Sequence, residues 1–515
     1  MSGLLRDGIA ILDFGSQTTQ LIARRVRELN IYCEIAPHHV DADQLLSRRP
    51  RGIILSGGPA SVYENGAPTV STQLLTDGPP VLGICYGMQL MTHLLGGEVA
   101  SSQAREFGHA DVRIETQTPL TQGVGPDLQV WMSHGDRILT LPNGFRGVAR
   151  SDNSPVAAMA DKEGLRYGLQ FHPEVVHTKQ GKQLLSNFAL NICKCPPRWT
   201  MESFVQSRVE EIRAETDGKR VLCAVSGGVD STVLAALLRR AVGEKAVCVF
   251  VDNGLMRLNE TPRVASMFRD QLGIDLRVVD AGERFLSALK GVVDPEEKRR
   301  AIGRTFIEVF ESELENLGEI DYLAQGTLYP DVIESVSAVG PSSTIKTHHN
   351  VGGLPESLRF QLIEPFRELF KDEARAVGRE LGLPEEALGR HPFPGPGLAV
   401  RILGEVTKER LAVLRKADAI FIEELRAAGL YDDIWQALTV LLPVRSVGVM
   451  GDARTYEHAV VLRAVVSLDG MTADWHPLPY DLLARVSNRI INEAVGINRV
   501  CYDVSSKPPA TIEWE

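Results

Sequence analysis

The sequence lacks the features of membrane-spanning and disulfide-stabilised proteins. No uninterrupted apolar run is long enough to cross a bilayer, and residues 1–7 lack the long apolar core of a secretory signal. The seven cysteines form no paired CxxC framework, and Cys193-Lys194-Cys195 would be half of a metal site without a second pair. We therefore expect a cytoplasmic protein with reduced thiols and no membrane partner.

Net positive charge is also missing. Lys and Arg number 55 against 66 Asp and Glu, which gives a formal net charge of −11. Such a chain has no bulk attraction for nucleic acid, so we expect no nucleic-acid partner, although a local basic pocket for a small phosphorylated ligand is compatible with it. The hydrophobic share of 44% and the charged share of 23% are ordinary for a globular protein, and 515 residues indicate about three domains of ~150 residues.

The first third of the chain alternates short apolar runs with helical stretches, which indicates a mainly parallel sheet covered by helices. Strands are expected at residues 9–14, 52–56, 81–84 and 165–171, and helices at residues 17–29 and 181–192. Residues 194–200 contain Pro196-Pro197 and break both periodicities. We interpret this stretch as a linker and predict that the first domain covers residues 1–198.

A second α/β pattern begins after the linker. Strands are expected at residues 221–225, 246–251, 276–279 and 322–324, and helices at residues 231–240, 295–317 and 371–381. Residues 328–358 lose the pattern and are rich in Ser, Gly, Pro and His, so we expect either a mobile functional lid or a disordered segment there. The second domain is predicted to cover residues 199–390.

The run from Arg390 to Gly397 is rich in proline and glycine and marks a second break. Beyond it, helices are expected at residues 408–428 and 478–495, and strands near residues 446–449 and 458–466. The predicted fold class is therefore α/β, with two doubly wound, mainly parallel-sheet domains followed by a small α+β domain over residues 391–515.

Cys85 is the one cysteine whose surroundings suggest reactivity. It follows an apolar strand, precedes an expected helix, and is flanked by Gly83 and Gly87 at the G-x-C-x-G spacing of a nucleophile elbow. A strained turn needs small neighbours, and the following helix N-terminus favours a thiolate and offers N–H groups to a developing oxyanion. A buried structural cysteine would be the alternative if this motif stood alone.

His172 and Glu174 supply the other groups that a cysteine nucleophile needs. They follow a strand, and alternation places both side chains on one side of the backbone, so that His172 can deprotonate Cys85 while Glu174 orients the imidazole. Gly57 and Gly58 end another strand and can supply oxyanion-hole amides. We predict a catalytic triad of Cys85, His172 and Glu174.

These motifs resemble those of a known family. Residues 83–89, Gly-Ile-Cys-Tyr-Gly-Met-Gln, and residues 172–174, His-Pro-Glu, are similar to the class I glutamine amidotransferase family. The resemblance implies hydrolysis of glutamine through a γ-glutamyl thioester on Cys85, with release of ammonia. It also implies that Tyr86 and Gln89 belong to the oxyanion and glutamine-binding site.

A glycine-rich loop between an expected strand and helix has the composition of an anion cradle. Glycines let the backbone approach phosphate, while hydroxyls and helix N–H groups bind its oxygens. It is not a Walker A loop, because no Gly-Lys-Ser/Thr follows, and a generic Ser/Gly turn is the alternative. The residues of the loop are Ser226, Gly227, Gly228, Val229, Asp230, Ser231 and Thr232.

The run S-G-G-x-D-S resembles the PP-loop of the N-type ATP pyrophosphatase family, which cleaves ATP between the α and β phosphates. The resemblance implies that AMP is put on an acceptor oxygen, pyrophosphate leaves, and a nitrogen or sulfur nucleophile displaces AMP. Asp230 is then a ligand of the Mg²⁺ that accompanies ATP or lies beside the pyrophosphate. Asp252, which ends the next strand, lies where the family contacts the nucleoside, and a turn cap is an equally good interpretation of this residue.

Four further segments, residues 325–335, 346–355, 391–398 and 506–515, resemble the GMP synthase family. The resemblance implies that glutamine, ATP and XMP are the substrates: ATP adenylylates the C2 oxygen of XMP, and ammonia displaces AMP to give GMP. Arg and Lys suit a ribose phosphate, and Gln and Glu suit polar purine edges. The residues that the resemblance assigns to XMP are Arg401, Gln436, Lys507, Ile512 and Glu513.

Two further expectations concern regulation and assembly. Lys346, in the expected lid, is assigned to stabilising charge on the leaving pyrophosphate or AMP, with an exposed lysine as the alternative. We expect that substrate binding orders residues 328–358 and switches on the cysteine site. The C-terminal domain is similar to the dimerisation domain of the family, which implies a homodimer.

Other interpretations keep the loop but change the acceptor, as in NAD synthetase, asparagine or argininosuccinate synthesis, or tRNA thiolation. Thiolation fits poorly because no catalytic CxxC pair and no basic RNA surface are evident, and the others lack the C-terminal signature. A non-catalytic nucleotide-binding dimer would predict erosion at Cys85, His172, Glu174 or Asp230, and none of these is eroded.

Overall fold

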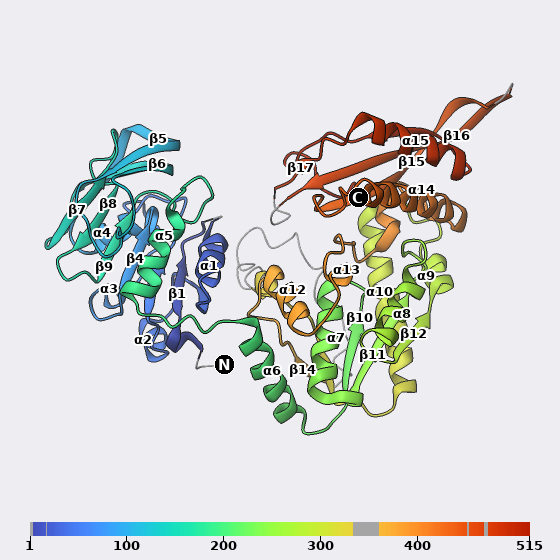
Figure 1. The fold of residues 1–515 in the computed structure, drawn as a ribbon, viewed down its shortest axis with the longest axis horizontal. Coiled ribbons are helices and arrows are strands. Elements are labelled where there is room, and N and C mark those ends of the chain that lie inside the picture. Colours follow the sequence, from blue (N-terminus) through green and yellow to red (C-terminus); the bar gives the residue numbers. More distant parts are fainter. Residues whose placement is uncertain (1–3, 17, 333–359, 451–452, 468–471) are drawn as a thin grey trace. The chain divides into compact units, whose positions relative to one another are not determined.

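The computed structural model describes residues 4–16, 18–332, 360–450, 453–467 and 472–515. The chain divides into two compact units, one formed by residues up to 204 and the other by described residues from 205 onward (Figure 1). Helix α6 (Met201–Thr216) begins at the end of the first unit and continues into the second. Each unit contains a sheet of its own with a run of parallel strands, as predicted.

The first unit is built on a nine-stranded sheet. Its parallel strands, in spatial order, are β2 (Cys33–Pro37), β1 (Ile9–Asp13), β3 (Gly52–Leu55), β4 (Val81–Ile84) and β9 (Arg166–Leu169). Every residue of β3, β4 and β9 is buried, as expected for strands covered on both faces. The helices are α1 (Thr19–Arg27), α2 (Ala42–Ser47), α3 (Gln73–Thr76), α4 (Tyr86–Leu94) and α5 (Gly181–Ser186), which a π-helical turn over Asn187–Ile192 continues.

The other half of this sheet is antiparallel and was not predicted from the sequence. Its strands, in spatial order after β9, are β8 (Ala158–Asp161), β7 (Phe145–Arg150), β5 (Glu98–Ile114) and β6 (Asp127–Thr140). From Leu128 to Ile138 every second residue of β6 is buried. A sheet half-exposed in this way mixes polar and apolar residues, so it has no continuous apolar run to reveal it.

The second unit contains a five-stranded parallel sheet. Its spatial order is β12 (Leu276–Asp280), β11 (Ala246–Asp252), β10 (Val221–Val225), β13 (Tyr322–Ala324) and β14 (Gln361–Ile363). The chain moves outward from β10 to β12 and returns to the other side of β10 with β13. Such a switch point is where open α/β sheets bind ligands, and the glycine-rich loop follows β10.

Helix α10 (Pro295–Leu317) begins where local chemistry satisfies one of its free N–H groups. At α10, the side chain of Asp294 accepts a hydrogen bond from the Glu297 N–H, and Pro295 occupies the first helical position. This helix therefore has the bounds that the sequence predicts. The helices are α7 (Val229–Val242), α8 (Glu260–Asp270), α9 (Gly282–Ala288), α10 (Pro295–Leu317), α12 (Lys371–Glu380) and α13 (Glu385–Leu388).

A second, smaller sheet follows in the same unit. Its strands are β15 (Gln436–Met450), β16 (Ala453–Val466), β17 (Asp474–Trp475) and β18 (Ile497–Tyr502), and its helices are α14 (Lys408–Ala427) and α15 (Tyr480–Glu493). One hydrophobic core runs from the parallel part into this part and includes Phe285, Leu398, Phe421 and Val486. The predicted small α+β region is therefore present, while its predicted boundary after residue 390 stays a prediction.

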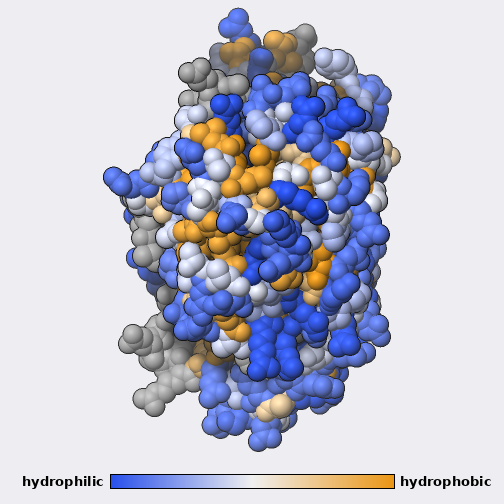
Figure 2. Space-filling view, turned by 90° about the vertical axis from the view of Figure 1, so that its left-hand side faces the viewer, coloured by the Kyte–Doolittle hydropathy of each residue, from blue (hydrophilic) through white to orange (hydrophobic). Residues whose placement is uncertain are grey.

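Within the described ranges, no helix combines the length and the apolar character that crossing a membrane requires. The face shown in Figure 2 is covered mainly by hydrophilic residues, with hydrophobic residues gathered in smaller areas between them. Large exposed apolar side chains of the molecule include Phe107, Val176 and Val449. Scattered apolar residues on a polar face are usual for globular proteins.

Candidate active sites

Cys85 lies between β4 and α4 in a backbone conformation that non-glycine residues rarely adopt, with φ 51° and ψ −107°. A Cβ on Gly83 would lie 2.6 Å from the Gly87 backbone, and a Cβ on Gly87 would lie 2.3 Å from the carbonyl oxygen of Leu55. Neither glycine has room for a side chain. The turn is therefore a strained elbow of the kind that the glycine spacing predicts.

His172 and Glu174 lie in the loop after β9, and both side chains are buried. The imidazole Nδ1 is 2.7 Å from Glu174 Oε1. Because a carboxylate accepts, Nδ1 is the donor. The same imidazole hydrogen-bonds the Cys85 side chain, so the structure brings the three predicted triad residues together.

The surroundings of His172 favour its charged form. Burial by itself lowers the pKa, but the hydrogen bonds to Cys85 and Glu174, together with the charges of both groups, outweigh burial and raise the pKa to about 10. The imidazole is therefore protonated at neutral pH. An imidazolium beside a thiol favours the nucleophilic thiolate.

Gly57 and Gly58 follow β3 and border the same turn. A Cβ on Gly57 would lie 3.2 Å from His172 Cε1, and a Cβ on Gly58 would lie 2.8 Å from the carbonyl oxygen of Phe14. Glycine at position 57 keeps the backbone close to the imidazole, and glycine at position 58 keeps it close to Phe14 and Tyr86. This placement suits the predicted supply of N–H groups to an oxyanion.

Tyr86 and Gln89 form the first turn of α4, and both are buried. Tyr86 Oη donates to the carbonyl of Pro68 at 2.5 Å, and burial raises its pKa to about 12. Gln89 Nε2 donates to the carbonyl of Asp136 and to Oε1 of Gln170, both at 3.3 Å. The Tyr86 side chain thus supports the turn, and its backbone N–H is the group that can serve an oxyanion at Cys85.

Three residues beside the triad were not predicted from the sequence. Gln170 Nε2 lies 3.8 Å from the Cys85 sulfur, and that sulfur donates to the Ser133 carbonyl at 3.6 Å. Thr178 Oγ1 donates to the His172 carbonyl at 2.6 Å and so fixes the loop that carries the imidazole. Alternation from His172 places Gln170 on the same side of the backbone, which was the available signal.

A buried polar cluster supports the segment that contains Ser133. His134 Nδ1 donates to the Asp136 carbonyl at 2.9 Å, while its Nε2 lies 3.1 Å from Glu106 Oε2. The other Glu106 oxygen accepts from Ser151 Oγ at 2.8 Å. Burial lowers the pKa of His134. These contacts fix the imidazole and give His134 a structural role beside the triad.

The glycine-rich loop of the second unit is held together by its own hydroxyls. Ser226 Oγ and Ser231 Oγ are 3.0 Å apart, Ser226 Oγ accepts from the Gly228 N–H at 3.3 Å, and Thr232 Oγ1 donates to the Gly228 carbonyl at 2.8 Å. Ser226 and Gly228 are exposed. The loop leads into the N-terminus of α7, where free N–H groups attract anions.

Asp230 lies in the first turn of α7, and one oxygen of its carboxylate is buried. Among the described residues, its Oδ1 has no hydrogen-bond partner. Burial raises the pKa of Asp230, the positive charges of Lys371 and Arg375 oppose the shift, and the negative charge of Asp331 adds to it. A buried carboxylate oxygen of this kind is available to a cation.

Asp252, at the end of β11, is engaged inside the chain. Its Oδ1 accepts from the Gly254 N–H at 2.9 Å, and its Oδ2 accepts from Thr261 Oγ1 at 2.6 Å. These contacts are those of a turn cap, the second of the two interpretations that the sequence left open. A contact between Asp252 and the nucleoside stays a prediction.

Three of the residues that the sequence assigns to XMP form one buried cluster. Arg401 donates to both carboxylate oxygens of Glu513, with Nη2–Oε1 2.8 Å and Nε–Oε2 3.1 Å, and Gln436 Nε2 donates to Glu513 Oε1 at 2.6 Å. The guanidinium of Arg401 is fully buried. A bidentate pair of this kind fixes the orientation of both side chains.

The other two assigned residues lie in the same C-terminal segment. Ile512 is buried against Val465, Ala473 and Trp435. The backbone of Lys507 exchanges two hydrogen bonds with Ala473, at 2.7 and 3.1 Å. The segment is thus packed on the second unit and is not a frayed tail.

Arg463 of β16 holds this segment in place and was not predicted. Its buried guanidinium donates to the carbonyls of Ser505, Thr511 and Ile512 at 2.9 to 3.1 Å. It also forms an ion pair with Asp503 at 2.9 Å. An arginine within an apolar strand gives no sign in the sequence of which distant backbone it will bind.

Lys298 of α10 is a second unpredicted anchor. Its fully buried Nζ donates to the carbonyls of Ile402 and Ala399 at 2.7 and 3.3 Å and to the carboxylate of Glu515, 217 positions away in the sequence. Burial of this ammonium is possible because its carbonyl and carboxylate partners replace water.

Lys346 and residues 333–358 of the expected lid lie outside the described residues. Their predicted roles are therefore untested.

Comparison with protein-family models divides the chain into three parts. Residues 10–192 match the model described as glutamine amidotransferase class-I, residues 199–303 match NAD synthase, and residues 423–514 match the GMP synthase C terminal domain. The second match covers the part that contains the glycine-rich loop. The third match contains four of the five residues that the sequence assigned to XMP, all except Arg401.

Curated relatives match over the full length of the chain. One from Chlorobium chlorochromatii is 59% identical, covering 98% of this chain and 99% of its own, and one from Wolinella succinogenes is 58% identical over 100% of both. One from Heliobacterium modesticaldum is 56% identical, covering 98% and 99%. All three carry the name GMP synthase (glutamine-hydrolyzing).

Proposed function

Because this chain belongs to the glutamine-hydrolysing GMP synthase family, we propose that Cys85 and the loop after β10 are the two reaction centres of one enzyme. The chain makes GMP in a glutamine-dependent reaction. The observation that carries the assignment of its centres is the buried arrangement of Cys85, His172 and Glu174 on the same chain as a phosphate-binding loop. The alternative of NAD synthesis is excluded, since the NAD synthase match covers only part of the chain.

In the first half-reaction, the Cys85 thiolate attacks the side-chain amide carbon of glutamine. The oxyanion that forms is stabilised by N–H groups at Gly58 and Tyr86. His172 gives its proton to the departing ammonia, and the C–N bond breaks as the thioester remains on sulfur. His172 then takes a proton from water, which cleaves the thioester to glutamate, while Glu174 keeps the imidazole oriented.

In the second half-reaction, the C2 oxygen of XMP attacks the α-phosphorus of ATP, and the bond to pyrophosphate breaks. Ammonia then attacks C2, the C–O bond to AMP breaks, and the new amino group loses one proton to give GMP. The loop from Ser226 to Thr232 binds the phosphates through N–H groups and hydroxyls. Enclosure keeps ammonia from being protonated and the adenylyl intermediate from being hydrolysed.

Without substrate, three of the proposed XMP-binding side chains are paired with one another. Arg401 and Gln436 both bind the Glu513 carboxylate. XMP therefore enters by exchanging partners with these side chains, with Arg401 turning toward an anionic group and Glu513 toward a purine N–H. Lys507 and Ile512 complete the proposed set.

The residues beside the loop also fit Mg²⁺. A nucleotide-bound Mg²⁺ takes one or two carboxylates along with phosphate oxygens, and Asp230 Oδ1 is a buried carboxylate oxygen without a hydrogen-bond partner among the described residues. When bound, the ion would neutralise phosphate charge during departure of pyrophosphate. Asp230 would hold it at the N-terminal turn of α7.

Three further parts of the proposal rest on the sequence alone. The family resemblance implies a homodimer formed through residues 391–515. The composition of the chain indicates a cytoplasmic location and a lid over residues 328–358 that carries Lys346. We infer that XMP and ATP order the lid and switch on glutamine hydrolysis. Full-rate glutaminase activity without XMP and ATP would refute this coupling, and sedimentation equilibrium tests the dimer.

Replacing the nucleophile tests whether the two centres are separable. Cys85→Ala should abolish glutamine-dependent GMP formation and retain GMP formation from ammonium salt, because the second centre does not use the thiol. Product is measured by chromatography with XMP and Mg-ATP. Cys501→Ala is the matched control, since Cys501 is exposed, and it should retain both activities. Loss of both activities in Cys85→Ala would contradict the proposal.

A further inference from the structure

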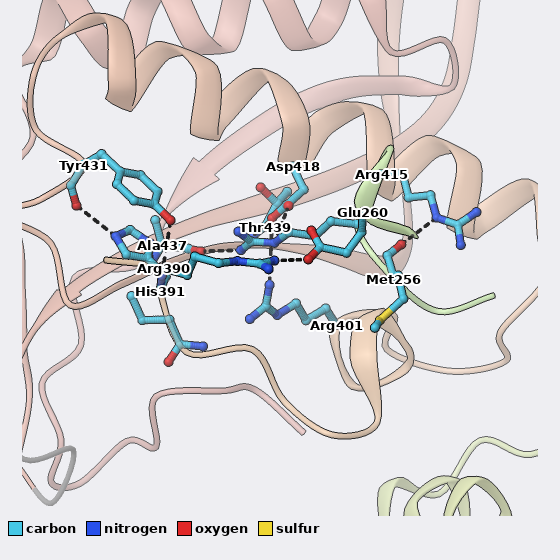
Figure 3. A network of polar contacts seen from close by, with 12 residues as sticks. Met256, Glu260, Arg390, His391, Arg401, Arg415, Asp418, Tyr431, Ala437 and Thr439 are labelled. Atoms are coloured by element: carbon cyan, nitrogen blue, oxygen red, sulfur yellow. Dashed lines mark hydrogen bonds and ion pairs between the residues drawn. The ribbon is translucent and has the colours of Figure 1, made fainter. Parts of the chain in front are cut away.

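The consecutive residues Arg390 and His391, which follow α13, contact the proposed ATP loop through one side chain and the proposed XMP strand through the other (Figure 3). Arg390 Nη1 donates to the Gly227 carbonyl at 2.7 Å, and its Nη2 pairs with the Glu260 carboxylate. His391 Nδ1 accepts from the Ala437 N–H at 3.2 Å. Because the two residues are adjacent in the chain, a shift of the loop at Gly227 can be passed to the strand at Ala437.

The arginine controls how the loop presents its peptide groups. Gly227 has φ 76°, and a Cβ there would lie 3.2 Å from Val264, so the position favours glycine. The Gly227 carbonyl and the Gly228 N–H belong to one planar peptide group, so fixing the carbonyl also orients the N–H. Arg390, itself fixed by buried Glu260, therefore sets the direction of the peptide group whose N–H donates to Ser226 Oγ within the loop.

The histidine is a fixed neutral connector. Because Nδ1 accepts from Ala437, Nε2 carries the hydrogen and donates to the Tyr431 carbonyl at 2.9 Å. The imidazole also stacks on the Tyr431 ring, with centroids 3.8 Å apart and planes at 7°. Burial is the main cause that lowers its pKa to about 4. A ring with both nitrogens used in this way serves positioning rather than proton transfer.

On the XMP side, both polar groups of one residue in β15 are held. The Ala437 N–H is bound by His391, and the Ala437 carbonyl accepts from Arg257 Nη2 at 2.9 Å. The preceding residue is Gln436, whose amide binds Glu513. His391 therefore helps, together with the pairing of β15 and β16, to set where Gln436 lies in the proposed XMP cluster.

We propose that Arg390 and His391 are positioning residues that couple the two nucleotide sites, so that binding of either nucleotide favours the arrangement needed by the other. The inference rests on the proposed assignment of the loop to ATP and of the Gln436–Glu513 cluster to XMP. Binding coupling is reciprocal, so the factor by which XMP tightens ATP equals the factor by which ATP tightens XMP. This reciprocity gives a quantitative test.

The experiment measures the affinity of the full chain for Mg-α,β-methylene-ATP by calorimetry, with and without saturating XMP. The native protein should bind the analogue about 5–150-fold more tightly with XMP present. Arg390→Lys keeps a charge for Glu260 but lacks the planar fork that reaches two acceptors, so it should reduce the factor to below about threefold. His391→Phe keeps stacking on Tyr431 and loses both hydrogen bonds, and it should have the same effect.

Arg379→Gln is the matched control, because it breaks an exposed ion pair with Glu385 in the same unit and should retain the native factor. The double variant Arg390→Gln/Glu260→Gln distinguishes loss of coupling from a folding defect, because it leaves no buried charge unpaired. This variant should remain folded, by its thermal transition, and lose coupling. Native coupling in the double variant or in both single variants would overturn the inference.

The result is distinguishable from failure of the proposed function. A native protein that makes GMP from XMP, Mg-ATP and ammonium but shows no coupling overturns only the inference. A native protein that makes no GMP with ammonium or glutamine overturns the function itself.

Discussion

The Cys85 turn and the loop after β10 both join a parallel strand to a helix, yet they are held in different ways. At Cys85 the backbone has φ 51°, and the flanking glycines are packed against the Gly87 and Leu55 backbones. In the loop, Ser226 and Gly228 are exposed, and hydroxyls within the loop hold its shape.

The difference follows from what each turn must do. A nucleophile that forms a covalent bond needs one fixed direction of attack, and dense packing around the turn can hold it in a strained conformation. An anion cradle needs N–H groups that stay open until phosphate arrives, so little can be packed against them. The first site is therefore complete without its substrate, and the second is completed by its ligand.

The largest effect should come from removing the base of the packed site. His172→Ala should lower kcat for glutamine hydrolysis by about 10²–10⁴-fold, the usual contribution of a general acid–base group. Ammonium-dependent GMP formation should be unchanged. His93→Ala is the control, since His93 is exposed on α4. A parallel fall in both activities would mean that the two sites are not independent.

The two turns should respond differently to an added methyl group. Gly87→Ala places a Cβ against the Leu55 carbonyl and should lower the free energy of unfolding by about 1–3 kcal/mol, as overpacking does. Gly228→Ala meets only Ser226 Oγ, at 3.3 Å, and should raise KM for ATP with little loss of stability. Urea unfolding and steady-state kinetics separate these outcomes.

Gly147→Ala is the control for this pair, because a Cβ on Gly147 in β7 meets no atom within 4 Å. Equal stability of the Gly87→Ala and Gly147→Ala variants would contradict the packing argument.

A smaller effect should come from the anchor of the C-terminal segment. Arg463→Lys keeps the charge beside Asp503 but loses most of the contacts to Ser505, Thr511 and Ile512. We expect KM for XMP to rise about tenfold, equivalent to about 1.4 kcal/mol, with the glutaminase activity unchanged. Arg499→Lys, at an exposed position that contacts Ser446, should leave KM unchanged. An unchanged KM in Arg463→Lys would show that the segment is held without this guanidinium.

The smallest effect concerns pH. Because the pKa of His172 is raised to about 10 by its partners, its stabilising effect is complete below the ordinary value of 6.5 and is lost as pH rises through about 10. NMR titration should show the His172 midpoint falling in Cys85→Ala, which removes one cause of the shift. Stability measured at pH 7 and 10 should differ less in that variant. An unchanged midpoint would contradict a charged Cys85–His172 pair.

Local patterns predicted much of this molecule, and long-range partners were missed. The start of α10 was predicted because Asp294 and Pro295 carry its capping chemistry in adjacent positions. The elbow at Cys85 was visible for the same reason, since its glycines lie two residues away on either side.

Partnerships between distant segments have no local signal. Lys298 reads as an exposed helix residue until Glu515 is placed beside it, and Arg463 reads as an isolated charge in a strand. The antiparallel half of the first sheet was missed because the prediction relied on continuous apolar runs, whereas β6 alternates buried and exposed residues. The sequence therefore did not predict which distant groups pair with buried charges, or which half-exposed strands pair with each other.

The left-handed backbone at Cys85 has an evolutionary consequence. A non-glycine residue held in such a conformation costs about 1–3 kcal/mol, which glycine would recover. A Cys85→Gly protein should thus be inert and yet harder to unfold than the native form. Gene copies released from the need to liberate ammonia would therefore be expected to accept glycine at this position.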